Sequence, residues 1–375
     1  MSKISGIIIK TAYDVVGDTS LVELFSKTCL EWVALAIQAP VSCVQNDESL
    51  SVPSLIKPYL DKESDYTVVL YSDTPLITAK TVCSALKEAQ STGANVVKMT
   101  RGFIFKTSFV LAVDNIYSIE TKYFDEEDFI VARSFKQIAL ISEILRNRIL
   151  SYHMERGVFI EDMASTYIGS DVSIGTGVRI SPNNTIKGNT VIKNNVRLDV
   201  GNHITDSILD EGSYVISSKL VHSYIGKNTE VGPYAHVRAD NVIGDNCKIG
   251  DFVELKKCRI GNGCKMGHLA YLGNVVMGNE CNVGAGVVFA NYDGKNKFTT
   301  AVGDRVFIGS QSTIVAPCKI DDGAFIGAGS VITHDVTARA LAIGRARQVE
   351  KKDWKGNKFA PAEANGEREG NNTGN

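Results

Sequence analysis

An aliphatic residue recurs every six positions over most of the C-terminal half of this chain. The run begins at Ile168, slips near 205–224, resumes at Ile225 and ends at Ile332. A β-strand alternates its faces every two residues, so six residues provide one short strand and one corner. Three such sides close a triangular coil, and successive coils stack as parallel sheets. The period therefore predicts a parallel β-helix, which we place at 158–345.

The residues two positions before the aliphatic ones should also point into the prism, where space is tight, so they should be small. They are Thr229, Ala235, Cys247, Val253, Cys258, Cys264, Ala270, Val275, Cys281, Val306, Ser312, Cys318, Ala324 and Ser330. Cys247, Cys264 and Cys281 are one coil apart and should form an internal ladder. A metal or redox site is the alternative, but small buried side chains explain these cysteines more simply.

The region before the repeat has the texture of an α/β domain, which we place at 1–132. Its apolar runs Ile4–Ile9 and Tyr66–Tyr71 predict strands, and the segments Ser20–Ile37 and Thr78–Gly93 predict helices between them.

Two further segments complete the chain. Apolar residues at helical spacing, among them Ile141 and Leu145, predict a linker helix within 133–157. The stretch 346–375, rich in Gly, Asn, Ala and Glu towards its end, predicts a C-terminal arm and a disordered tail.

Composition narrows the class of protein. The 375 residues are 44% hydrophobic and 22% charged, with a net charge of −2. This balance predicts a globular protein without a nucleic-acid or membrane partner. The apolar run Ile7–Ile9 is too short for a signal peptide, so we expect a cytoplasmic protein with reduced cysteines.

Several polar side chains lie outside the predicted prism in consecutive coils. They are Arg238, Lys256, His268, Tyr271 and Asn282. The repeat is interrupted beside them by the polar loop 290–298, ANYDGKNKF. Each residue alone is typical of a solvated surface, so only their grouping suggests a site.

The segments around these residues resemble one family over 225–354. They include GPYAHVR (232–238), DFVELKK (251–257), KMGHLAYLG (265–273), CNVGAGVVFANYDGKNKF (281–298), VFIGSQSTIVAP (306–317) and ALAIGRARQ (340–348). The HLAYLG and NYDG motifs are similar to those of the acetyltransferase domain of the bifunctional GlmU family. The resemblance implies a left-handed β-helix and a homotrimer with sites between subunits.

The resemblance also implies an activity, the acetyl-CoA-dependent N-acetylation of glucosamine-1-phosphate on the route to UDP-N-acetylglucosamine and peptidoglycan of the cell wall. His268 would be the general base, a role that suits an imidazole near neutral pH. The sugar phosphate would be bound by Arg238, Lys256, Tyr271, Asn282 and Lys297. Acetyl-CoA would be bound by Ala285, Asn291, Tyr292, Ser310, Ala328 and Arg345.

The N-terminal half departs from the family, whose members carry a Rossmann-like nucleotidyltransferase domain there. The expected Gly-rich phosphate loop is replaced by KTAYDVV (10–16). Asp73 in YSDTPLI (71–77) matches the family's Mg²⁺ ligand, but Ala132 stands where a second ligand is expected. With that second ligand missing, we expect Mg²⁺ not to be retained, so we predict a degenerate domain without uridyltransferase activity, in which Asp73 is at most a vestigial Mg²⁺ ligand.

Two alternatives stay open at this point. The chain could retain uridyltransferase activity through an unorthodox UTP site, or act as a non-catalytic β-helix subunit that partners a separate uridyltransferase. The acceptor could also be another amino-sugar phosphate.

Overall fold

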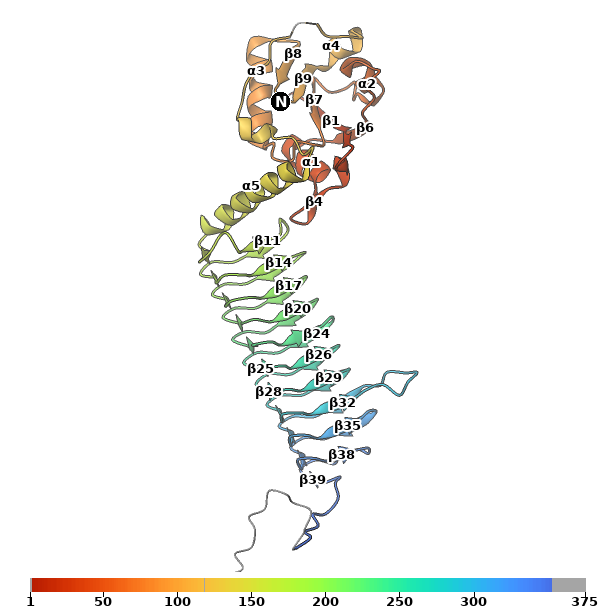
Figure 1. Ribbon diagram of the computed structural model, residues 1–375, viewed down its shortest axis with the longest axis vertical. Helices are drawn as coiled ribbons and strands as arrows, with labels where there is room; N and C mark the ends of the chain where they lie inside the picture. The colour runs from red at the N-terminus through yellow and green to blue at the C-terminus, as the bar shows by residue number, and fades with distance from the viewer. Residues whose placement is uncertain (1, 118, 353–375) are drawn as a thin grey trace, which may run out of the picture.

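The computed structural model describes residues 2–117 and 119–352, which form an N-terminal α/β domain, a helix and a long β-helix (Figure 1). The domain contains a five-stranded mixed sheet. Strand β1 (Ile4–Lys10) lies between β6 (Val41–Gln45) and β7 (Tyr66–Tyr71) and is parallel to both. Strand β9 (Gly102–Lys106) runs antiparallel to β7 and to the edge strand β8 (Val96–Met99). The α/β class expected from the sequence is confirmed.

Helices cover both faces of this sheet because its strands are apolar on both sides. In β1, Ile8 packs into a cluster with α1 and α3, whereas Ile7 and Ile9 pack on the opposite side with residues of α2 and α4. The helices are α1 (Cys29–Ile37), α2 (Val52–Ile56), α3 (Ala79–Thr92) and α4 (Thr107–Ala112), with short 3-10 turns at Thr19–Leu21, Lys57–Tyr59 and Glu126–Phe129.

The helix predicted over Ser20–Ile37 is wrong in its first half. Residues 23–28 instead form a hairpin of β4 (Glu23–Leu24) and β5 (Lys27–Thr28), which turns through Phe25 and Ser26 at positive φ. Helix α1 starts only after Thr28, whose side chain and Glu31 form a capping box. The prediction over Thr78–Gly93 is confirmed, because Thr78 caps α3 and Gly93 ends it in the left-handed conformation.

Helix α5 (Phe135–Met154) joins the two parts and falls within the range predicted for the linker. Its Ile141 and Leu145 pack against the N-terminal domain, whereas Leu150 belongs to the apolar core of the β-helix. Arg148 donates hydrogen bonds to the Leu76 carbonyl (2.6 Å) and to the buried carboxylate of Asp128 (3.0 Å). One helix therefore packs against both parts.

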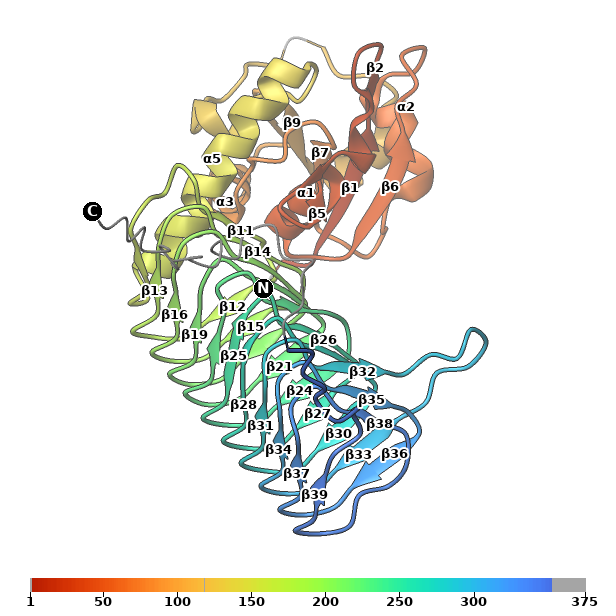
Figure 2. The ribbon, with the colours of Figure 1, turned by 60° about the horizontal axis from the view of Figure 1, so that its bottom comes forward.

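The remainder is a left-handed parallel β-helix of three sheets, seen obliquely from its C-terminal end in Figure 2. Sheet 1 contains β10 (Phe159–Ile160), β13 (Arg179–Ile180), β16 (Arg197–Leu198), β19 (Tyr214–Val215), β22 (Glu230–Val231), β25 (Lys248–Asp251), β28 (Lys265–His268), β31 (Asn282–Val283), β34 (Phe307–Ile308), β37 (Phe325–Ile326) and β39 (Leu341–Ala342). Sheet 2 contains β11 (Tyr167–Ile168), β14 (Thr185–Lys187), β17 (His203–Thr205), β20 (Lys219–Val221), β23 (His236–Val237), β26 (Glu254–Lys256), β29 (Tyr271–Gly273), β32 (Val288–Ala290), β35 (Thr313–Val315) and β38 (Val331–Ile332). Sheet 3 contains β12 (Ser173–Ile174), β15 (Val191–Ile192), β18 (Ile208–Leu209), β21 (Ser223–Ile225), β24 (Asn241–Ile243), β27 (Arg259–Ile260), β30 (Val275–Met277), β33 (Thr300–Val302) and β36 (Cys318–Ile320).

The slip expected near 205–224 is not an interruption of the β-helix. Leu209, Val215 and Leu220 are fully buried there and continue the inward row. Three of the steps between Ile204 and Ile225 are five residues long, so corners are shortened by one residue while the sheets keep their register.

The small inward positions are buried as predicted. The thiols of Cys247, Cys264 and Cys281 donate to the carbonyls of Gly261, Gly278 and Gly303 at 3.0–3.1 Å. Burial raises the pKa of the Cys258 thiol to about 11. Within residues 2–117 and 119–352, no cluster of three or more His, Cys, Asp and Glu side chains is arranged to hold a metal ion. Their burial and their bonds to neighbouring carbonyls are those of side chains packed along the prism axis.

No helix in the described part of the chain has the length and apolar character needed to cross a membrane. The tail predicted at the C-terminus lies outside the described residues from 353 on.

Candidate functional site

The corner between sheets 1 and 2 carries a row of residues, one from each coil. His268 ends β28, and strand register pairs it with Asp251 at the end of β25. Continued along the pairs of β31, β34 and β37, the register adds Ala285, Ser310 and Ala328 to the same row. Main-chain hydrogen bonds of 2.8 Å tie the last three together, from Gln311 to the Ala285 carbonyl and from Gly329 to the Ser310 carbonyl. We call these five residues the corner row.

The corner row brings the predicted general base into line with three predicted acetyl-CoA positions. Beyond His268 the side chains of the row are small, so they project little from the surface of the β-helix. Gly267, directly before His268, has open space where a side chain would stand. Arg345, another predicted acetyl-CoA position, lies beside Gly329 one coil beyond Ala328, with its Cδ 3.6 Å from an ideal Cβ at Gly329.

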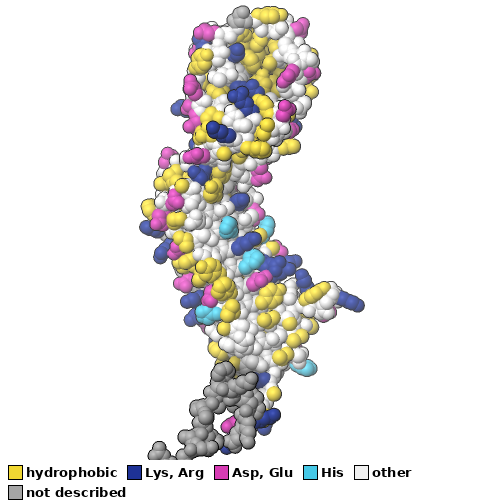
Figure 3. Space-filling model, viewed as in Figure 1, with side chains coloured by type: hydrophobic (Ala, Val, Ile, Leu, Met, Phe, Trp, Pro, Cys, Tyr) yellow, Lys and Arg dark blue, Asp and Glu magenta, His cyan; other side chains and the backbone are white. Residues whose placement is uncertain are grey.

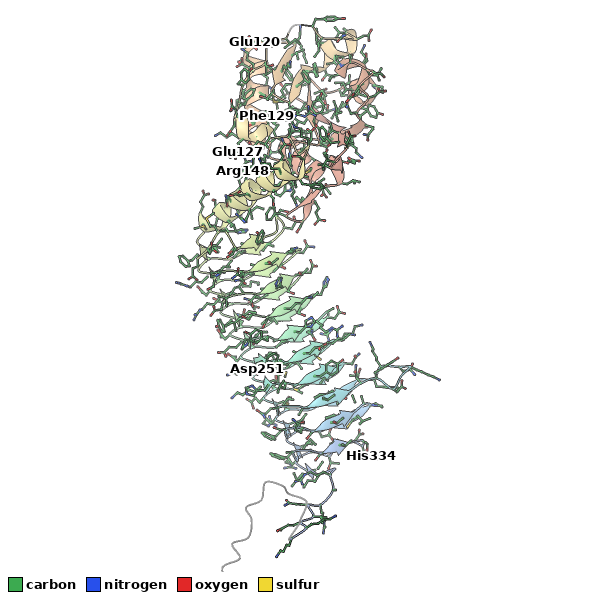
Figure 4. All side chains as sticks on the ribbon, in the orientation of Figure 1. Glu120, Glu127, Phe129, Arg148, Asp251 and His334 are labelled. Atoms are coloured by element: carbon green, nitrogen blue, oxygen red, sulfur yellow. The ribbon has the colours of Figure 1, made fainter. Side chains whose placement is uncertain are left out.

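Asp251 and His268 form an ion pair on this corner, and Asp251 is labelled in Figure 4. The contact joins Nδ1 of the imidazole to Oδ1 of the carboxylate. A carboxylate only accepts hydrogen bonds, so Nδ1 carries the proton and Nε2 keeps its lone pair when the ring is neutral. Sequence reasoning missed Asp251; the available signal was its position 17 residues before His268, one coil away.

The predicted sugar-phosphate residues of sheet 2 lie on adjacent strands. Arg238 follows β23, and its Nη1 donates to the Glu254 carboxylate at 2.7 Å. Glu254 is in register with Tyr271, and burial together with the charge of Glu254 raises the pKa of Tyr271. Glu254 is a second polar residue that sequence reasoning missed, and it holds Arg238 at this face.

A loop brings a further cation to this cluster. The segment 291–299 between β32 and β33 projects from the β-helix, as Figure 1 shows at the right. Within it Tyr292 pairs with Lys297, and Asp293 accepts main-chain hydrogen bonds that close the turn. Lys297 contacts Lys256 and, with the charge of Arg238, lowers the pKa of Lys256.

The three cations Arg238, Lys256 and Lys297, which we call the cationic cluster, therefore repel one another. A space-filling view shows basic side chains gathered along this side of the β-helix (Figure 3). Mutual repulsion is relieved when an anion such as a phosphate binds between the charges. The described residues of one chain supply only the Glu254 carboxylate, already bonded to Arg238, in direct contact with this cluster.

Three further predicted residues, Asn282, Asn291 and Tyr292, belong neither to the corner row nor to the cationic cluster. Asn282 is on sheet 1, paired with Lys265 and Phe307. Asn291 is buried, donates to Asn274 at 2.8 Å and closely approaches Gly273. Tyr292 is exposed on the loop, and its hydroxyl donates to the Gly294 carbonyl at 2.6 Å. One chain therefore does not gather all of the predicted residues into one pocket.

The N-terminal domain does not offer a metal site at Asp73. This fully buried carboxylate accepts hydrogen bonds from Arg101 Nε (2.7 Å) and Nη2 (2.5 Å) and from the Tyr13 hydroxyl (2.7 Å). Burial and the bond to Asp73 raise the pKa of Tyr13 to about 12. Ala132 donates its main-chain N–H to the Asp73 carbonyl. The residues present thus fit an internal ion pair, not a Mg²⁺ ion.

A short hairpin takes the place of the expected phosphate loop. Strands β2 (Ala12–Tyr13) and β3 (Gly17–Asp18) form a short hairpin. At the base of this hairpin, the hydroxyls of Thr11 and Thr19 and that of Ser72 bond to one another at 2.8–3.3 Å.

Comparison with family models places residues 220–309 with the GMPPB C-terminal domain and residues 299–334 with the bacterial transferase hexapeptide (six repeats). Among curated proteins, the bifunctional protein GlmU of Clostridium novyi is 46% identical over 218 residues, which are 58% of this chain and 48% of that protein. The same protein of Clostridioides difficile is 44% identical over 61% of this chain and 50% of its own length. The chain spans about half the length of the curated relatives it matches.

Among solved structures, an Arabidopsis UDP-N-acetylglucosamine acyltransferase matches with 22% identity and a TM-score of 0.35, covering 48% of this chain and 70% of that one.

Proposed function

We propose that this chain, whose β-helix is similar to that of the GlmU proteins, is a cytoplasmic enzyme that transfers the acetyl group of acetyl-CoA to the amino group of glucosamine-1-phosphate. The observation that carries the proposal is the corner row, where His268 stands in line with Ala285, Ser310 and Ala328. The product would serve the synthesis of UDP-N-acetylglucosamine and cell-wall precursors.

In this reaction His268 acts as general base. Its Nε2 accepts the proton that the amino nitrogen loses as that nitrogen bonds to the thioester carbonyl carbon. The carbon–sulfur bond then breaks, and the departing thiolate takes up the proton, so that the imidazole returns to its neutral form. Imidazole suits both steps because its ordinary pKa lies near neutral pH.

The two substrates approach from different sides. The cationic cluster of Arg238, Lys256 and Lys297 supplies charge-assisted bonds for the sugar phosphate. Coils stack about 4.8 Å apart, so the corner row from His268 to Ala328 extends roughly 14 Å. Small side chains along that length suit an extended, thin donor such as the pantetheine arm of acetyl-CoA, whose phosphates would reach Arg345.

The separation of Asn282 from the cationic cluster within one chain supports a site completed by a second copy. We therefore include in the proposal the homotrimer that the family resemblance implies. Asn291 and Tyr292 would contact acetyl-CoA bound along the corner row of a neighbouring copy.

The test is thiol release from acetyl-CoA in the presence of glucosamine-1-phosphate and of related amino-sugar phosphates. His268→Ala should lower kcat at least 100-fold, because general-base catalysis contributes about 10²–10⁴-fold. His334→Ala is the matched control, since His334 is also an exposed histidine of the β-helix (Figure 4). Unchanged kcat in His268→Ala would remove the proposed mechanism, and no thiol release by the wild-type protein would remove the proposed function.

The Asp73–Arg101 pair argues against a retained uridyltransferase activity, because it occupies the carboxylate that a metal-dependent transfer would need. We propose that the N-terminal domain is a degenerate nucleotidyltransferase-like domain.

A further inference from the structure

We propose that Asp251 is a positioning residue for His268, an assignment that rests on the proposed function. Asp251 determines which ring nitrogen carries the proton and which one faces the amino group of the acceptor. It bonds Nδ1 of His268 and thereby directs the basic lone pair to Nε2.

The backbone places these two side chains next to each other. Phe252 follows Asp251 and Leu269 follows His268, and both turn the corner at positive φ (55° and 50°). Bulky residues rarely adopt this left-handed conformation, which costs roughly 1–2 kcal/mol in each. The Leu269 N–H donates to the Asp251 carbonyl at 2.9 Å and joins the two corners. Two strained corners of the same shape therefore hold the carboxylate against the ring.

The chemistry explains why this bond matters. A neutral imidazole has two tautomers, and only the one with hydrogen on Nδ1 presents a lone pair at Nε2. When Nε2 takes a proton from the acceptor, the Asp251 carboxylate also stabilises the imidazolium that forms. Asp251 itself does not contact the reacting atoms, and no proton is transferred to it.

An ordinary surface ion pair is the competing explanation, worth only about 0–1 kcal/mol of stability. The same chain contains such a pair for comparison. His222 and Asp206 also lie one coil apart on adjacent corners, with side-chain exposures of 57% and 29% against 65% and 33% for His268 and Asp251. That contact is longer, 3.6 Å, and it uses Nε2 of the ring. Asp206→Ala is therefore the matched control for Asp251→Ala.

The kinetic test compares Asp251→Ala, Asp251→Glu and Asp206→Ala in the full chain. Asp251→Ala should lower kcat at least about 10-fold while KM for both substrates changes less than about threefold, because removing the carboxylate that orients a histidine costs about 10- to 100-fold at metal-bound histidines and up to about 10⁴-fold in a buried catalytic triad. Asp251→Glu should recover part of kcat, and Asp206→Ala should match the wild type. Full kcat in Asp251→Ala, or a loss confined to KM, would overturn the proposal.

A second readout does not depend on activity. In ¹⁵N-histidine spectra of the wild-type protein above the pH at which His268 is neutral, the His268 signals should show hydrogen on Nδ1. In Asp251→Ala they should show hydrogen mainly on Nε2, while Asp206→Ala leaves them unchanged. Hydrogen on Nε2 in the wild type would refute the positioning role. If Nδ1 is protonated as expected but no amino-sugar phosphate is acetylated, the proposed function fails and the pairing stands.

Discussion

The negative charge of Asp73 is neutralised inside the protein by the side chain of Arg101. The Arg101 guanidinium bonds both carboxylate oxygens and lies over the Tyr71 ring at 4.3 Å from its centroid. A guanidinium has a fixed shape that matches a carboxylate, so the pair is satisfied without an added cation. The N-terminal domain should accordingly fold without Mg²⁺.

Arg101→Met should therefore destabilise the N-terminal domain. Removing one partner leaves the buried Asp73 carboxylate without its cation, and such losses cost about 3–5 kcal/mol; the low end applies because Arg101 is 29% exposed. Urea denaturation followed by far-UV circular dichroism measures the change. The double variant Arg101→Met, Asp73→Asn should recover part of the stability, and failure to recover any would show that the charge of Asp73 is not the cause.

The sequence motifs do not single out the side chains that oppose the site residues. His268, Arg238 and Lys256 stand out because their motifs resemble a family. Asp251 and Glu254 become visible only when the coil register is known, since each meets its partner across neighbouring strands. In the sequence, Asp251 looks like an ordinary surface residue. Only the lengths of the repeat steps between it and His268, five or six residues each, show that the two side chains meet on adjacent strands.

The inward positions that lie two residues before each aliphatic residue accept only small side chains. Cys264 is fully buried, and its thiol donates to the Gly278 carbonyl at 3.1 Å. Serine occupies the same type of position at Ser312 and Ser330, where each hydroxyl donates to the Gly327 carbonyl. The position therefore takes a small side chain, and where that side chain carries a donor, it bonds a nearby main-chain carbonyl.

Cys264→Leu should consequently destabilise the β-helix, because overpacking a filled core costs about 1–3 kcal/mol. Cys264→Ser should cost about 1 kcal/mol or less, since its hydroxyl can keep the bond to the Gly278 carbonyl. Thermal unfolding of the two variants beside the wild type gives the comparison. A larger loss in the serine variant than in the leucine variant would contradict this assignment of the position.

The architecture was predictable because the β-helix repeats one local rule many times. Some steps, such as those around Leu209 and Leu220, are five residues long instead of six. The missing residue is taken from a corner, so the period is harder to recognise in the sequence although the fold continues. The resemblance to the GlmU family over 225–354 is confirmed as a similarity, since the bifunctional protein GlmU of Clostridium novyi is 46% identical over 218 residues, 48% of its own length. The start of α1 was missed because the hairpin turn through Phe25 and Ser26 has no glycine or proline to mark it.

The two parts of the molecule are joined through α5 and the β4–β5 hairpin. Arg148 bonds the N-terminal domain through Leu76 and Asp128, and Arg146 donates to the Ala164 carbonyl on the β-helix side at 2.9 Å. Lys27 pairs with Asp171 of the first coils. Helix α5 thus closes the N-terminal end of the β-helix and carries the other domain.

Arg148→Ala should loosen the N-terminal domain without affecting the coils. Asp128 would keep its bonds to Thr78 and Thr81 but lose the guanidinium. Limited proteolysis should then cut faster between the domain and α5, while acetyl transfer stays unchanged. Lys80→Ala, at an exposed position of α3, serves as the control. Loss of acetyl transfer in Arg148→Ala would show that the two parts are coupled more tightly.

The corner row also converts sequence distance into length. Each 17- or 18-residue coil advances the row by one strand spacing, about 4.8 Å, and each coil contacts only its neighbours. The loop at 291–299 adds residues at a different corner and leaves this spacing intact. The length of a molecule bound along the row therefore corresponds to a whole number of coils. Replacing one small residue of the row by a large one would block the row at that coil and so limit the length of the donor that the protein accepts.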